Sequence, residues 1–194
     1  EVGKKSYTEE TCLNSVFPYD VSKSCSDLIC QSYSKTYDLK IGILRCANLY
    51  GPGDLNKNRL INGFIISTIK NKTFRIRSNG KLVRDYLFID DAVNAYYLTM
   101  LSLIKKNSKL RIYNVGSKYN MNVFDMIKKI SKLNLNKQIK IKVLNTSKKE
   151  ILTQKLNYRK ISKELNWKQY INLNEGLRQT YNWYQANIKF FDSY

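Results

Sequence analysis

The chain has 194 residues, of which 34 are Lys or Arg, 15 are Asp or Glu and none is His, giving a formal charge of +19. No apolar run approaches the roughly 18 residues that a membrane span requires, and the polar first eleven residues lack the apolar core of a signal peptide. The basic residues are scattered rather than gathered in one stripe, so we expect no nucleic-acid partner, although a positive field would attract a diphosphate-bearing ligand.

In the first half of the chain, the pattern predicts an α/β arrangement. Residues 1–17 are expected to form a loop, and Pro18 is expected to begin a helix that reaches about Thr36, because proline suits the first helical turn. The apolar run at residues 40–51 predicts a buried, parallel strand that leads into a Gly-Pro-Gly turn. A helix over 59–70 and a short strand over 73–77 follow.

The second half of the chain continues the mixture. Residues 84–89 predict a strand, Asp90 is expected to cap a helix that ends near Lys105, and residues 110–115 predict another strand. Asn122 is expected to cap the next helix, which runs to about Leu133. The remaining elements are a strand and two helices, expected over residues 139–144, 158–165 and 174–188.

The cysteines indicate no metal site. Cys12, Cys25, Cys30 and Cys46 form no C-x-x-C pair, and the chain offers no histidine ligand. We therefore expect four free thiols, as in a protein of the reducing cytoplasm.

Tyr19 and Lys23 are the first candidates for chemistry. Four residues apart, they would lie one turn apart on the same face of the first helix. An ammonium group near a phenol lowers the pKa of the phenol, and such a phenol can exchange a proton with a sugar hydroxyl. Taken alone, the pattern is more typical of a solvated helix face.

Four motifs, in this order along the chain, favour the catalytic interpretation of Tyr19 and Lys23. They read PYDVSKSCSDLI (18–29), LRCANLYGPGD (44–54), IRSNGKLVRDYLFIDDAVNAYYL (76–98) and ISKELNWKQYINLNEGLRQTYNWY (161–184). Together they resemble the extended short-chain dehydrogenases/reductases, the NAD-dependent epimerase/dehydratase family, over nearly the whole chain. The segments PYDVSKSC, GDLNKNRLI and IRSNG are most similar to those of the CDP-glucose 4,6-dehydratases.

The resemblance implies NAD as cofactor and a nucleotide-diphosphate sugar as substrate. Tyr19 would transfer the proton at the sugar O4, and Lys23 would hold the nicotinamide ribose and lower the pKa of Tyr19. Glu1 would fall near the position of an acid or base that acts at the sugar C5–C6 bond. The Y-x-x-x-K helix would also pair two subunits in a homodimer.

Four polar residues are implied as substrate contacts. Asn48, expected just past its strand, would contact the phosphates, and Arg84 would hold the diphosphate with its planar donor fork. Arg59 and Arg77 would contact the nucleotide. The family's usual R-L-I-P reads RLIN here, and Asn62 in place of proline predicts a looser substrate loop.

The resemblance also predicts the domains. Residues 1–57 would be the remnant of a NAD-binding Rossmann domain, and residues 58–194 mainly a substrate domain, with about 84–105 returning to the Rossmann part. The sequence holds no G-x-x-G-x-x-G or G-x-G-x-x-G fingerprint for the NAD pyrophosphate, so we expect a C-terminal fragment of the enzyme without turnover of its own.

Three other functions stay open at this point. A nucleotide-sugar 4-epimerase would need Tyr19 and Lys23 but no acid/base pair at C5–C6. A non-catalytic fragment that only binds sugar nucleotides would need neither. A basic nucleic-acid-binding protein would show steep salt dependence of binding.

Overall fold

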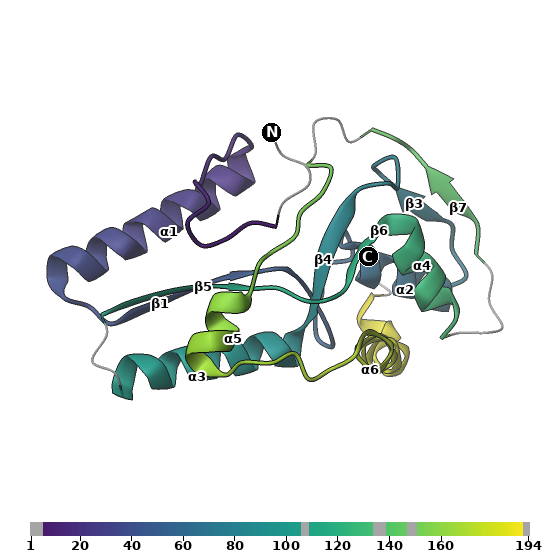
Figure 1. Ribbon diagram of the computed structural model, residues 1–194. Helices are drawn as coiled ribbons and strands as arrows, with labels where there is room; N and C mark the ends of the chain where they lie inside the picture. Colours follow the sequence, from purple (N-terminus) through teal and green to yellow (C-terminus); the bar gives the residue numbers. More distant parts are fainter. Residues whose placement is uncertain (1–5, 106–108, 134–138, 147–150, 192–194) are drawn as a thin grey trace.

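Two helices enclose a pair of parallel strands at one end of the molecule. The computed structural model describes residues 6–105, 109–133, 139–146 and 151–191. Strand β1 (Ile41–Cys46) pairs in parallel with β5 (Leu110–Val115), with Ile41 opposite Leu110 and Cys46 opposite Val115. Helix α1 (Pro18–Tyr37) lies along one side of the pair and α3 (Ile89–Lys105) along the other (Figure 1). The expected α/β fold with a parallel sheet is confirmed.

Alternate residues of β1 explain this enclosure. A β-carbon added at Gly42 would lie 2.7 Å from Thr99 Cγ2 of α3, whereas Arg45 bonds to Asp27 of α1. Residues of opposite parity point to opposite faces of a strand, so one face of β1 packs on each helix. Among the described residues, β5 is the sole strand that pairs with β1, and the other edge of β1 is open.

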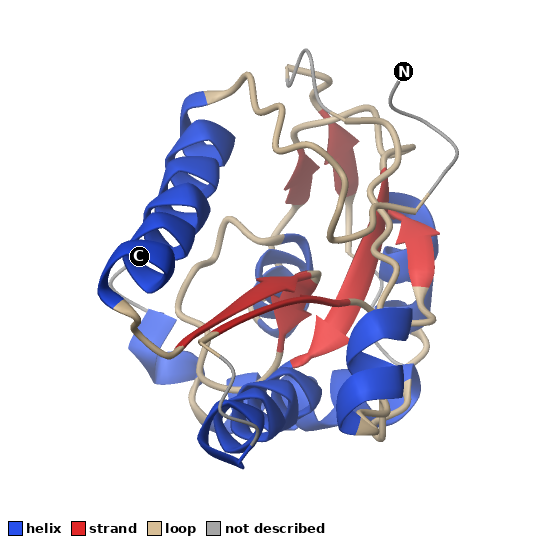
Figure 2. Ribbon diagram, turned by 60° about the vertical axis from the view of Figure 1, so that its left-hand side comes forward, coloured by secondary structure: helices blue, strands red, loops and turns tan. Residues whose placement is uncertain are grey.

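The second region is built on a three-stranded sheet. Its strand order is β2–β4–β6, with β2 (Asn48–Tyr50) parallel to β4 (Val83–Phe88) and β6 (Asn120–Asn122) antiparallel to it. A separate parallel pair joins β3 (Phe74–Ile76) to β7 (Ile141–Val143). All three β7 residues are exposed. Figure 2 shows the strands at the centre of the molecule and helices around them.

The single strand expected over residues 40–51 is wrong, because the chain changes sheets within it. After Cys46, the Ala47 N–H still donates to Val115 O at 2.9 Å, but Asn48 then pairs with Tyr86 of β4. One apolar run therefore supplies two strands, and Asn48 begins the second rather than following the first.

Four further helices complete the chain and cover these sheets. They are α2 (Leu60–Ile69), α4 (Val123–Ser131), α5 (Arg159–Leu165) and α6 (Leu173–Ala186), followed by a 3-10 turn at Ile188–Phe191. The larger core packs α2, α4 and α6 on β2 and β4, around Phe64, Phe88 and Tyr184. A smaller core under α3 and α5 holds Tyr113 and Trp167, both fully buried. None of the described helices is long and apolar enough to cross a membrane.

Helix capping was predicted correctly at one site and wrongly at another. Asn122 caps α4, accepting a hydrogen bond from the Asp125 N–H at 2.9 Å, as expected. Asp90 does not precede its helix, because β4 runs directly into α3 at Ile89 and Asp90 lies inside the first turn. Its neighbour Asp91 is buried and accepts the Tyr170 N–H at 2.8 Å.

An apolar stripe follows the outer face of α3. Its members are spaced three or four residues apart and are each about half exposed: Val93, Tyr96, Tyr97, Met100 and Ile104. Tyr96 hydrogen-bonds with the thiol of Cys46, the last residue of β1. This bond places part of the stripe beside β1, whereas α5 packs against α3 and β5.

An ion pair fixes α1 to β1. Arg45 Nε donates to Asp27 Oδ2 at 2.7 Å, and both side chains are largely buried. Burial alone would raise the pKa of Asp27, but hydrogen bonds from Arg45 and Gln31 outweigh it, and the pKa is lowered. Arg45 also donates to Glu9 O at 2.8 Å, so the same guanidinium holds the N-terminal loop.

We expect Asp27→Asn to lower the free energy of unfolding at pH 7 by about 2 kcal/mol, because it leaves a buried guanidinium without its carboxylate. The lowered pKa means that this stabilisation is present above about pH 4 and is lost as the pH falls through the folded-state pKa. Urea unfolding at pH 7 and pH 3 measures both effects. Asp38→Asn is the matched control, since its pair with Lys109 is exposed and contributes little. Equal losses in the two variants would contradict the anchoring role of Asp27.

The four thiols are free, as expected, and should differ in reactivity. Burial raises the pKa of Cys46 from 9.0 to about 11, against the effect of its hydrogen bond with Tyr96. Since the thiolate is the nucleophile, iodoacetamide at pH 8 should alkylate the exposed Cys12 and Cys25 first and Cys46 roughly a hundredfold more slowly. Time-resolved mass spectrometry measures the order. In urea all four rates should converge, and equal rates in the folded chain would refute the prediction.

Candidate functional site

Tyr19 and Lys23 lie together in the first turns of α1. The Lys23 Nζ is 5.6 Å from the centroid of the Tyr19 ring, so the two side chains share a helix face. Tyr19 is 70% exposed, which leaves the phenol accessible to a ligand. Pro18 occupies the first helical position, as predicted, and fixes where this face begins.

The Asp27–Arg45 pair aligns this face with the end of β1. Helix α1 returns through a short loop into β1, so the two elements run in opposite directions. From the ion pair, Tyr19 lies about two helical turns toward the helix start, and Asn48 lies three residues on, past the carboxyl end of β1. The Tyr19–Lys23 face and Asn48 therefore project toward the same end of the strand pair, where ligands bind in open α/β sheets.

Asn48 and Arg84 share one face of the second sheet. Asn48 is in register with Tyr86, and Arg84 precedes Tyr86 by two residues, so all three lie on the same side. Burial raises the pKa of Tyr86 to about 12, and the nearby Arg84 guanidinium opposes that shift. Asn48 is exposed and Arg84 half-buried, so a polar amide and a fixed cation are presented from neighbouring strands.

Arg84 is held by backbone carbonyls. Its Nη1 donates to Val83 O at 3.0 Å and to Ile151 O at 2.7 Å. These bonds restrict the position of the Arg84 guanidinium on β4.

Sequence reasoning did not find the carboxylate beside it. Asp85 is 1% exposed and accepts the Ser117 N–H at 2.9 Å, the Ser117 hydroxyl at 2.7 Å and the Leu156 N–H at 3.3 Å. Burial raises the pKa of Asp85, and these hydrogen bonds oppose the shift. The R-D-Y motif was the available signal, since an aspartate inside a buried strand needs local donors.

Arg59 and Arg77 meet at a different loop. Arg59 Nη1 lies 3.1 Å from Asp54 Oδ2, and Arg77 Nη2 donates to Asn58 O at 3.5 Å. Both side chains are exposed; Arg59 lies in the segment between β2 and α2, and Arg77 directly follows β3. The structure thus forms three groups from the predicted residues, Tyr19 with Lys23, Asn48 with Arg84, and Arg59 with Arg77. Glu1 lies outside the described residues.

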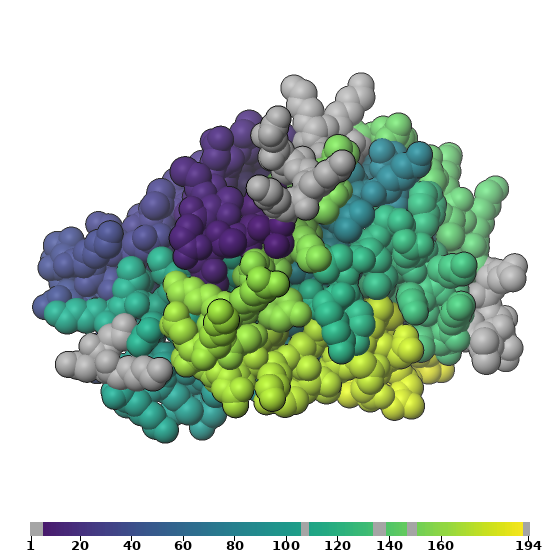
Figure 3. Space-filling model, in the orientation of Figure 1, coloured from purple at the N-terminus to yellow at the C-terminus, as the bar shows by residue number. Residues whose placement is uncertain are grey.

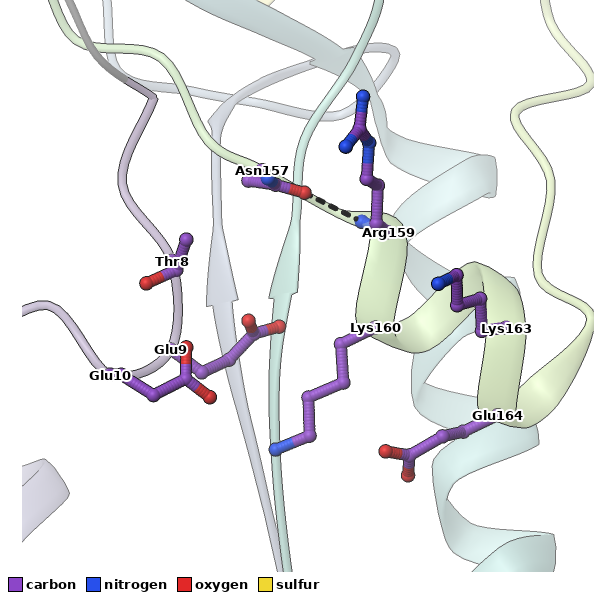
Figure 4. A pocket seen from close by; sticks show the side chains of 8 residues that line it. All are labelled: Thr8, Glu9, Glu10, Asn157, Arg159, Lys160, Lys163 and Glu164. Atoms are coloured by element: carbon purple, nitrogen blue, oxygen red, sulfur yellow. Dashed lines mark hydrogen bonds between the residues drawn. The ribbon is translucent and has the colours of Figure 1, made fainter.

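A pocket of about 440 Å³ lies apart from all of these residues. Figure 3 shows the N-terminal segment against the residues around α5, and Figure 4 shows Glu9 and Glu10 facing Lys160 and Glu164 across the pocket. Glu9 Oε1 accepts the Asn114 N–H at 2.8 Å, and Glu164 Oε2 accepts the Tyr113 hydroxyl at 2.7 Å. Because the carboxylates of Glu9 and Glu164 are engaged with β5, this pocket is best explained as a packing gap between the N-terminal loop and α5. In the described part of the chain, no group of three or more acidic or cysteine side chains could hold a metal ion.

Comparisons with known proteins identify the family. Residues 1–116 match the NAD dependent epimerase/dehydratase family. The dTDP-D-glucose 4,6-dehydratase of Dictyostelium discoideum is 28% identical, and the match covers 96% of this chain and 50% of that protein. This chain therefore spans about half the length of that curated relative.

Solved structures show the same relationship. The dTDP-glucose 4,6-dehydratase of Streptomyces venezuelae, solved with NAD bound, has a TM-score of 0.89 and 26% identity, covering 99% of this chain and 58% of that one. The UDP-glucuronic acid 4-epimerase of Bacillus cereus, in complex with UDP-glucuronic acid and NAD, shares the fold with a TM-score of 0.85 and 21% identity, over 96% and 58% of the two chains. The family match covers more than half of the sequence, and so the chain belongs to the NAD-dependent epimerase/dehydratase family.

Proposed function

We propose that the chain is the substrate-binding and proton-transferring half of a nucleotide-sugar 4,6-dehydratase, which gives a 4-keto-6-deoxy sugar nucleotide. The observation that carries the proposal is the Tyr19–Lys23 pair, accessible at the same end of β1 as Asn48, with Arg84 on the same sheet face as Asn48. A phenol for the sugar ring and a cation for the diphosphate are the two groups that such a substrate needs.

The resemblance to the family suggests a role for each side chain, and the positions of the side chains support these roles. Tyr19 takes the proton from the sugar O4, and the Lys23 ammonium one turn away stabilises the resulting phenolate. Arg84, restrained by two carbonyls, binds the diphosphate, and Asn48 donates to the phosphates from the neighbouring strand. Glu1 keeps its proposed role as the acid or base at the C5–C6 bond.

NAD fits the accessible face of α1 at its ribose end. The Lys23 ammonium and the exposed Tyr19 hydroxyl are suitable donors for a ribose at this position. NAD bound there would supply a hydride acceptor for the sugar C4 and, after water is lost across C5–C6, a hydride donor for C6. Among the described residues, no strand leads through a glycine-rich turn into a helix, so the pyrophosphate needs donors from elsewhere.

Two finer points concern the substrate and the assembly. The sequence favours CDP-glucose as the substrate, whereas the named dehydratases act on dTDP-glucose. A binding competition between CDP, UDP and dTDP would identify the nucleotide base that this chain prefers. We also propose a homodimer through α1, which exposes Leu28, Ile29 and Tyr33. A 4-epimerase is the second candidate. The UDP-glucuronic acid 4-epimerase compared above is 21% identical to this chain, and this level of identity supports a shared fold but not a shared reaction.

We expect the chain to bind at least one of CDP, UDP and dTDP saturably, with Arg84→Ala weakening binding by roughly 1.5–3 kcal/mol through loss of a charge-assisted hydrogen bond. Titration calorimetry measures both values. Arg75→Ala is the control, since Arg75 is an exposed arginine on β3 and tests the effect of net charge alone. Equal losses in the two variants, or nucleotide binding weaker than binding to DNA of any sequence at low salt, would favour the nucleic-acid interpretation.

We expect the same chain to bind NAD weakly and to show no turnover, because the described residues offer the ribose contacts without a pyrophosphate site. Calorimetry with NAD, in the buffer in which a nucleoside diphosphate binds, measures this directly. Tight, saturable NAD binding would show that the expectation is wrong.

A further inference from the structure

Asn62 stands where the resembled family has proline, and its environment is the opposite of a loose loop. It is 1% exposed, in the first turn of α2. Its side-chain amide donates to Asp54 O at 3.4 Å and to Asn56 O at 3.2 Å. The expected loosening of the substrate loop is therefore wrong, because the amide draws two carbonyls of that loop onto the helix.

The two carbonyls belong to the residues that hold Arg59. The Asp54 carboxylate pairs with the Arg59 guanidinium at 3.1 Å, and Asn56 O accepts the Arg59 N–H at 3.2 Å. The amide of Asn62 is thus linked to Arg59 in two ways. Asp54 connects it to the Arg59 guanidinium, and the carbonyl of Asn56 connects it to the Arg59 backbone N–H.

Other contacts hold the same loop. We call the two hydrogen bonds from the Asn62 amide to Asp54 O and Asn56 O the clamp. The buried Tyr184 hydroxyl of α6 also donates to Asp54 O. A β-carbon at Gly63 would lie 2.5 Å from Lys57 O, so the loop packs directly on the backbone of α2. Asn58 O, in the same loop, accepts from Arg77.

We propose that Asn62 is a positioning residue that sets the guanidinium of Arg59, and with it the Arg59–Arg77 spacing, for a nucleoside diphosphate. This inference rests on the proposed function. A proline at this position would be compatible with the first turn, since the first intrahelical bond of α2 is donated by Gly63, but it would supply no amide. Asn62 therefore gives the loop two hydrogen bonds that a proline at this position could not supply.

The test is a double-mutant cycle in the full chain. Asn62→Leu and Arg59→Ala should each weaken binding of the best-bound nucleoside diphosphate about tenfold, and the double variant should also lose about tenfold rather than a hundredfold, because Asn62 acts through Arg59. Asn62→Pro should match Asn62→Leu, since both remove the amide. A hundredfold loss in the double variant, or unchanged binding in Asn62→Leu, would overturn the proposal.

A second measurement separates this inference from the proposed function. In the free protein, Asn62→Leu should speed amide hydrogen exchange at residues 56, 58 and 59 by at least tenfold, while amides of α4 keep their rates. Unchanged exchange in the loop overturns the clamp whether or not a nucleotide binds. Faster exchange together with a wild-type chain that binds no nucleoside diphosphate would retain the clamp and reject the proposed function, and with it the positioning role.

Discussion

The buried carboxylate of Asp85 is the constraint on which the arrangement depends. A carboxylate taken out of water is costly unless donors surround it. Here the donors come from Ser117, directly after β5, and from Leu156, in the segment that leads to α5. One side chain of the three-stranded sheet therefore joins both the parallel strand pair and the C-terminal segment. Leu156 also forms a bridge with Tyr7, so the N-terminal loop is tied to the same point.

This junction explains why candidate groups from distant segments can face one ligand. Tyr19 and Lys23 belong to the helix that Arg45 fixes to β1, whereas Asn48 and Arg84 belong to the other sheet. Only Ala47 separates β1, which pairs with β5, from β2, which pairs with β4. Because the connection is this short, the residues proposed for proton transfer, at the end of β1, lie next to those proposed to bind the diphosphate, on the sheet of β2 and β4.

The sequence was informative where a residue acts through its own chemistry. Pro18 and Asn122 set helix starts by local bonding, and both were predicted from spacing alone. The crossing at Ala47 was not, because no Gly or Pro stands between the two strands, so residues 43–50 read as one strand. Asp85 was overlooked, and the effect of Asn62 was predicted wrongly, for a related reason. Their partners are mostly backbone groups brought near by folding, and the sequence does not show which groups these will be.

The open edge of β1 and the apolar stripe on α3 have a practical consequence for handling the protein. In the part of the chain that the structure describes, one edge of β1 pairs with no strand, and exposed Val93, Tyr97 and Ile104 lie on the neighbouring helix α3. Other chains can add to such a surface. What opposes that addition in dilute buffer is mutual repulsion between molecules that each carry a formal +19. Repulsion of this kind fades once the Debye length shrinks to about 8 Å at 0.15 M salt. Colloidal stability should therefore be greatest at low ionic strength, and purification steps that end in high salt should favour self-association.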